Sequence, residues 1–102
     1  MKVKSFKSYL EKRLDKSEIA EIEQVAKVEY DILLALQQDV AGDVVNFMSD
    51  NHIGFNDLVR KLGKSPTQVS NIIKGDANLT MATIAQIYAL MGKKVRIKKE
   101  AA

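Results

Sequence analysis

The stretch FNDLVRKLGKSPTQVSNIIKG, residues 55–75, contains two short helical patterns separated by a tight turn. The first pattern covers residues 55–62 and is predicted to stop at Gly63, because glycine readily takes the left-handed conformation found after a helix C-terminus. The second covers residues 66–74 and follows Ser65, a hydroxyl residue typical of an N-cap. It begins with the only proline of the chain, at the helical position where a missing N–H does no harm, and it ends before another glycine.

The second of these predicted helices has two chemically distinct faces. At about 100° per residue, Val69, Ile72 and Ile73 fall on one side, where they are expected to pack against the preceding helix. The opposite side and its flanks carry only hydroxyl, amide or cationic side chains: Thr67, Gln68, Ser70, Asn71 and Lys74. Because no carboxylate lies there, this side can approach phosphates, and its amides and hydroxyls match hydrogen-bonding groups on base edges.

Two short helices joined by a turn that contains glycine are typical of a helix-turn-helix, which presents its second helix to the DNA major groove. We therefore expect Thr67, Gln68 and Asn71 to read bases, since glutamine and asparagine can each bind an adenine bidentately. Lys64 and Lys74, at the two ends of the helix, are expected to contact backbone phosphates. The alternative is an amphipathic surface helix whose polar face is only solvated.

The segment before this motif is also predicted to be helical. Ser17, followed by acidic residues, indicates a helix start, and apolar residues then recur at three- and four-residue spacing to about Gln38. A second apolar stripe covers residues 40–48. Whether the first helix continues into it is open, because Gly42 weakens a helix without forbidding it. Residues 1–16 fit either a short strand or a helical turn.

After the motif, a last helix is expected to follow the N-cap Thr80 and to end at Gly92. The alternation of apolar and basic residues over 95–98 predicts a short edge strand, whose partner would be a second copy or the N-terminal arm. The predicted fold is thus all-α, a helix-turn-helix bundle with a leading amphipathic helix and a short C-terminal strand. We divide it into residues 1–38, for dimerisation or partner binding, and residues 39–102, for DNA binding.

The chain is long enough for one modest hydrophobic core, and its composition is that of a globular protein. It has 102 residues, of which 46 % are hydrophobic and 28 % charged. No cysteine is present, which excludes disulfides and thiolate chemistry. No apolar run is long enough for a membrane helix or a secretory signal, so we expect a cytoplasmic protein.

Charge is distributed unevenly along the chain. Residues 54–102 carry nine basic and three acidic residues, a net charge of +6. Residues 18–50 carry one basic and eight acidic residues, a net charge of −7. This polarity predicts one surface for an anion and another for a neutral or cationic partner, unless both are only solvated helix faces.

Nothing in the sequence indicates catalysis, a metal site or a cofactor. His52 is the only histidine and lies in a loop pattern, where a solvent-exposed turn residue is expected rather than a ligand. The glutamates of the leading helix have no nucleophile or base beside them. Gly63 and Gly75 stop helices and do not form a phosphate-binding loop. We therefore expect a binding protein and not an enzyme.

Residues 53–75, together with residues 78–92, resemble the phage-repressor (Cro-like, XRE) helix-turn-helix family. The resemblance is carried by three groups of positions: Leu58, Leu62 and Gly63; Val69, Ser70, Ile72 and Gly75; and Asn78, Leu79, Thr80, Ala89, Leu90 and Gly92. It implies a lambda-repressor-like domain that acts as a homodimer on a near-palindromic operator in double-stranded DNA, as a repressor of transcription. It also implies base reading by Thr67, Gln68 and Asn71, and backbone contacts from Lys64 and Ser65. We expect Ser70 and Lys74 to contact the DNA backbone as well.

Two positions depart from the pattern of that family. Phe55 stands where the family often has a glutamine that contacts phosphate, and Val59 stands where it prefers alanine. The first departure puts one phosphate contact in doubt, and the second is expected to separate the two helices slightly. More loosely, the layout is similar to that of HigA-type antitoxins, which would imply a basic toxin protein bound by residues outside the DNA-reading helix. A helix that packs on the core or on its twin is the simpler explanation of the acidic segment.

Overall fold

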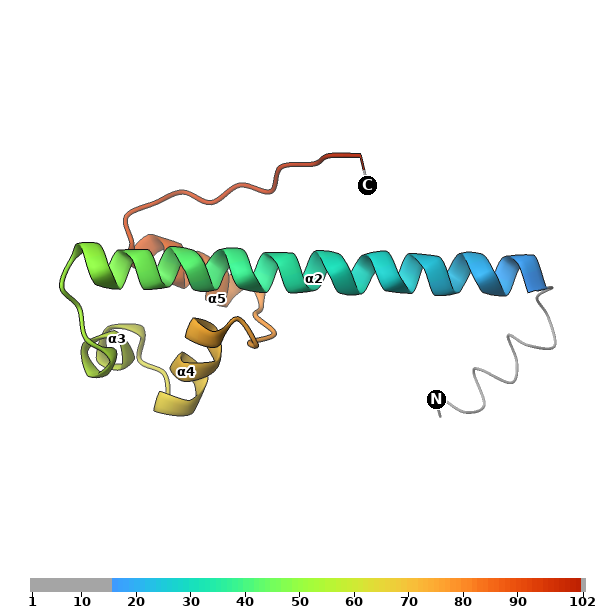
Figure 1. The fold of residues 1–102 in the computed structure, drawn as a ribbon. Helices are drawn as coiled ribbons and strands as arrows, with labels where there is room; N and C mark the ends of the chain where they lie inside the picture. The colour runs from blue at the N-terminus through green and yellow to red at the C-terminus, as the bar shows by residue number, and fades with distance from the viewer. Residues whose placement is uncertain (1–15, 102) are drawn as a thin grey trace. The chain divides into compact units, whose positions relative to one another are not determined.

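A computed structural model describes residues 16–101, and within this range the secondary structure is entirely α-helical (Figure 1). The helices are α2 (Lys16–Asp50), α3 (Phe55–Leu62), α4 (Pro66–Lys74) and α5 (Met81–Leu90). The prediction of an all-α protein is therefore confirmed. None of the described helices is long and apolar enough to cross a membrane.

The leading helix is longer than the sequence pattern required. α2 is one continuous helix through Gly42, so the apolar stripes before and after Gln38 belong to the same element. Ser17, expected as the N-cap, lies inside α2, and the predictions for residues 1–15 fall outside the described residues. The chain divides into two compact units whose boundary lies within this helix, between Ile32 and Leu33, and the residues from 33 onward form the second unit.

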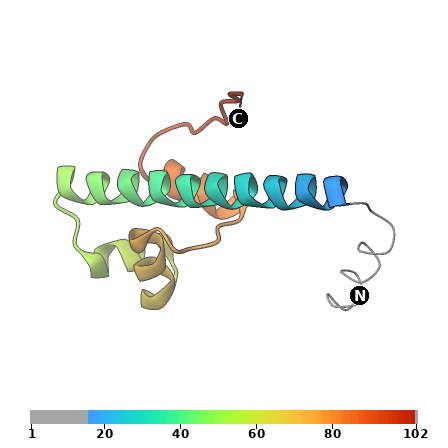
Figure 2. The ribbon, with the colours of Figure 1, turned by 45° about the vertical axis from the view of Figure 1, so that its right-hand side comes forward.

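The core of the second unit takes two buried side chains from every helix. They are Val40 and Val44 of α2, Leu58 and Leu62 of α3, Val69 and Ile72 of α4, and Ile87 and Tyr88 of α5. α3 contacts both α4 and α5, and α3 and α4 lie side by side in both ribbon views (Figure 2). Because each short helix contributes to the same core, its position depends on the other three.

α3 and α4 end where the sequence predicted a glycine, and α4 and α5 begin where it predicted a polar N-cap. Gly63 follows α3 with φ 64°, in the left-handed region, and its N–H donates to the carbonyl oxygen of Val59. The Thr80 side chain accepts from the N–H of Thr83 at the start of α5. Gln86 of α5 donates to the carbonyl oxygen of Leu62 at 2.8 Å, which satisfies an orphan acceptor at the C-terminus of α3.

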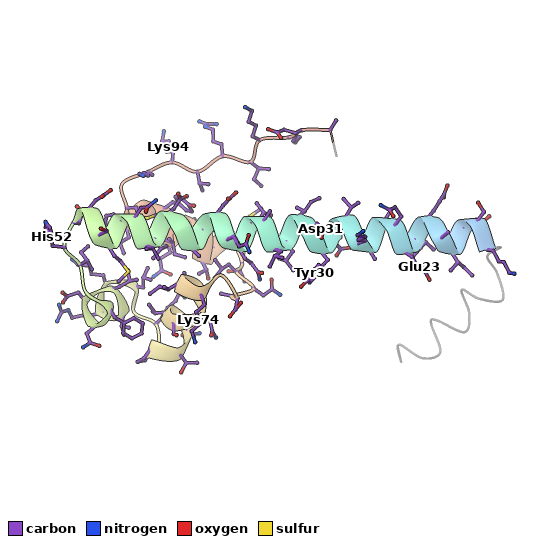
Figure 3. All side chains as sticks on the ribbon, in the orientation of Figure 1. Glu23, Tyr30, Asp31, His52, Lys74 and Lys94 are labelled. Carbon is purple, nitrogen blue, oxygen red and sulfur yellow. The ribbon has the colours of Figure 1, made fainter. Side chains whose placement is uncertain are left out.

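α2 ends in a left-handed turn formed by a residue other than glycine. His52 has φ 53°, and its N–H donates to the carbonyl oxygen of Ser49. The N–H of Ile53 donates to the carbonyl oxygen of Met48 at 2.9 Å, which completes a Schellman motif. His52 is exposed, as expected for a turn residue (Figure 3).

A half-buried polar contact joins α2 and α5. The Tyr88 hydroxyl donates to the Asp43 carboxylate, and the tyrosine as a whole is 7 % exposed, with its ring in the core. Burial, and then the hydrogen bond and negative charge of Asp43, raise the pKa of Tyr88 above its ordinary value of 10.0. Two residues 45 positions apart are thereby held together across the unit.

The short strand predicted over residues 95–98 is not confirmed. These residues adopt neither helix nor strand, and all four are exposed. The alternation of Val95 and Ile97 with basic residues permits a strand, but a strand forms only when its N–H and C=O groups pair with a neighbour. No neighbouring strand exists among the residues that the structure describes.

Candidate nucleic-acid interface

α4 has a buried side and an exposed polar side, as the sequence pattern predicted. Val69 and Ile72 are buried in the core, and Ile73 is half-buried against it. The side chains at the predicted base-reading positions, Thr67, Gln68 and Asn71, are all exposed. Lys74 is exposed at the last turn, and Ser70 is half-buried on the flank. We call the exposed residues 67, 68, 71 and 74 the α4 polar face.

A reciprocal capping box holds the first turn of α4. The Ser65 Oγ accepts from the Gln68 N–H at 3.2 Å, and the Gln68 Oε1 accepts from the Ser65 N–H at 3.0 Å. The pattern S-x-x-Q that signals this motif is present in the sequence, and base reading by Gln68 does not account for it. In this structure the cap occupies the amide oxygen of Gln68 and leaves the amide nitrogen available as a donor.

This cap changes what Gln68 can do at a base edge. Bidentate binding of adenine needs both the oxygen and the nitrogen of the amide, so it would require Gln68 to release the Ser65 N–H. Asn71 carries the same chemistry one turn further along α4 and has no part in the cap. Asn71 is therefore the amide of the α4 polar face that is best placed for bidentate contact.

The C-terminus of α4 is fixed against α2. Gly75 is buried with φ 78°, and an added Cβ would lie 3.6 Å from both the Cβ of Ala41 and the carbonyl oxygen of Gln37. Gln37 also donates to the carbonyl oxygen of Ala77 at 2.9 Å, just beyond this turn. Both ends of α4 are thus held, so its exposed side chains project from a rigid support.

The electrostatic surroundings of α4 suit an anion. The first turn of α4 contains no acidic residue, so the partial positive charge of its N-terminus is not neutralised within the helix. Lys64 is half-buried and Ser65 exposed in the turn before it, and Lys74 is exposed at the other end. On the adjacent α3, Asp57 pairs with Arg60. The half-buried Lys64 and the exposed Lys74 therefore place one cation at each end of the α4 polar face.

Phe55 and Val59, the two residues that depart from the pattern of the phage-repressor family, differ in their exposure. Phe55 is exposed at the first position of α3, so it supplies no polar group for a phosphate there. Val59 is half-buried and packs against the core.

The basic residues of the tail do not extend the α4 polar face. Lys94 of the tail and Lys74 of α4 lie on opposite sides of the second half of α2 in the view of Figure 3. The cations that follow α5 are Lys93, Lys94, Arg96, Lys98 and Lys99, and all are exposed. Their +5 charge is therefore presented on another surface of the same unit.

Comparison with known proteins finds no relative of the chain. No family model matches the chain, and neither a curated protein nor a solved structure matches it. The geometry of α3, α4 and the turn between them is therefore the basis for a functional interpretation.

Proposed function

We propose that the chain is a sequence-specific DNA-binding regulator that inserts α4 into the major groove. The observation that carries the proposal is the α4 polar face: an exposed face of hydroxyl, amide and cationic groups on a helix held at both ends. A face that reads bases needs this combination of hydrogen-bonding variety and rigid support.

Each residue of the interface has a distinct role in this proposal. Asn71 reads a base through a bidentate contact, and Thr67 contacts a base edge or a thymine methyl. Gln68 fixes the entry of the helix through the capping box and donates through its remaining amide nitrogen. Lys64 and Lys74 neutralise phosphates on either side of the groove, and Ser65 and Ser70 contact the same backbone.

A single α4 covers only a few base pairs, so useful specificity requires two copies of the chain. In a symmetric dimer the two α4 helices would enter successive major grooves about 34 Å apart, on a near-palindromic site. Lys64 and Lys74, at the two ends of the α4 polar face, would draw this surface to DNA of any sequence before the specific site is found.

The phosphate contacts can be tested before any operator is known. Binding of the purified chain to a random-sequence duplex is measured at several salt concentrations for the natural chain and for Lys74→Ala. Loss of one phosphate contact should weaken binding and reduce the slope of log K against log salt by about 1. Lys99→Ala, in the tail, is the matched control and should leave the slope nearer its original value. Equal slopes for Lys74→Ala and the natural chain would refute the placement of α4 on DNA.

A further inference from the structure

Within residues 33–101, a groove of about 460 Å³ separates the outer side of α5 from the tail. Its walls are mainly apolar, with small alanines on α5 and a valine in the tail, and its rim is cationic. The lining residues are Ala85, Tyr88, Ala89, Lys93, Lys94, Val95 and Arg96. We call it the α5–tail groove. Its chemistry is suited to a narrow apolar ridge flanked by carboxylates.

The first part of α2, within residues 16–32, presents a ridge of that kind. Val25 is 65 % exposed and Ile32 is 51 % exposed, and seven-residue spacing places them within about 20° of each other around the helix. Glu21 and Glu29 stand four residues before and after Val25, each about 40° from it. Both are exposed. We call Glu21, Val25, Glu29 and Ile32 the α2 ridge.

The signs of charge decide which surfaces can meet. Two α2 ridges placed together would oppose carboxylates, and two α5–tail grooves would oppose ammonium and guanidinium groups. A ridge placed in a groove instead joins apolar to apolar and acidic to basic side chains. The groove also lies away from Lys74 and the α4 polar face, so its occupation leaves that face open (Figure 3).

We propose that the α2 ridge of one copy docks in the α5–tail groove of a second copy, and that the partner returns the same contact. In a two-fold dimer the symmetry axis that places the ridge of one copy in the groove of the partner also places the ridge of the partner in the groove of the first copy. The occupant of the groove is thus a second copy of this chain. Dimerisation by this route does not depend on DNA, so it can fail or succeed separately from the proposed function.

Charge reversal tests the proposal in solution without DNA. One variant carries Glu21→Lys and Glu29→Lys, and the other carries Lys93→Glu, Lys94→Glu and Arg96→Glu. Sedimentation velocity at low salt should show each variant alone dissociating on the order of a hundredfold more readily than the natural dimer, since like charges then meet in both contacts. An equimolar mixture should dimerise again, because each reversed ridge meets a reversed groove and each natural ridge meets a natural groove.

The matched control is Glu23→Lys, which lies about 160° around α2 from Val25 and should leave the dimer intact. Circular dichroism of every variant checks that the helices persist. The proposal is overturned if the natural chain is monomeric, if both reversed variants dimerise as the natural chain does, or if their mixture stays monomeric. It is also overturned if the variant with Glu21→Lys and Glu29→Lys still forms a homodimer and loses only its binding to a basic partner protein, such as a toxin.

Discussion

α4 and the first part of α2 are both amphipathic helices, but only α4 buries its apolar side. α4 has nine residues, buries its apolar Val69 and Ile72, and exposes amides, a hydroxyl and a lysine. Residues 16–32 of α2 bury no side chain and expose Val25, Tyr30 and Ile32 among acidic residues. The comparison shows that a helix of two or three turns is stable only when it packs against other helices. A long helix can form with few such contacts.

The largest expected difference between the two helices is in the free energy of unfolding lost when an isoleucine in each is replaced by alanine. Ile72 of α4 is 2 % exposed, and Ile32 of α2 is 51 % exposed. Ile72→Ala should lower the free energy of unfolding by about 2–5 kcal/mol, because it leaves a cavity in the shared core. Ile32→Ala, measured at protein concentrations low enough for the chain to be monomeric, should change it by less than about 0.5 kcal/mol. Urea unfolding of both variants measures the contrast, and equal losses would show that the first part of α2 is also packed within the folded chain.

Removing the polar contact between α2 and α5 should have the next largest effect. Tyr88→Phe deletes the hydrogen bond to Asp43 while keeping the buried ring, and should cost about 1.5–3 kcal/mol because the acceptor is charged. The loss should diminish as pH rises above 10.0, since the raised pKa of Tyr88 stabilises the folded chain only while the hydroxyl is protonated. Denaturation midpoints of both proteins between neutral pH and pH 11 test this. A gap that stays constant with pH would contradict it.

Alanine in place of glycine should have opposite signs in α4 and α2. Gly75→Ala forces a side chain into a positive φ after α4 and should cost about 1–2 kcal/mol. Gly42→Ala lies within α2 with no atom near the new Cβ, and should stabilise the protein by about 0.5–1 kcal/mol. Thermal unfolding compares the two variants. Stabilisation by both would mean that the turn after α4 is not left-handed in solution.

A smaller loss of stability than that of Gly75→Ala is expected at the N-cap of α4. Ser65→Ala removes the acceptor for the Gln68 N–H and should cost about 1 kcal/mol of stability. Ser49→Ala, near the exposed end of α2, provides the control and should cost less. If Ser65→Ala is no more destabilising than Ser49→Ala, the capping box does not hold α4.

The sequence predicted those features that depend on neighbouring residues. Ser65, Thr80 and Gly63 mark helix ends through local hydrogen bonds and local backbone geometry, and the structure has helix ends at all three. The exposed positions of Thr67 and Asn71 followed from helical spacing once Val69 and Ile72 were assigned to the core. The all-α class followed from the same patterns.

Other features depend on contacts that a local pattern does not contain. The pairing of Tyr88 with Asp43 joins distant positions, and continuity of α2 through Gly42 depends on the helix being held on both sides of it. The capping role of Gln68 was visible as S-x-x-Q but competed with its value as a base reader. The strand at residues 95–98 required a partner that alternation of side chains alone does not supply.

Selection of bound sites from a pool of random duplex DNA tests the central claim most directly, because it reports binding, specificity and half-site spacing together. The natural chain should enrich one short motif, repeated with inverted symmetry about one helical turn, roughly 10 base pairs, apart. Asn71→Ala should lose preference at one position of each half-site while still binding DNA. Enrichment of no motif by the natural chain, or of an unchanged motif by Asn71→Ala, would contradict the assignment of α4 as the helix that reads DNA.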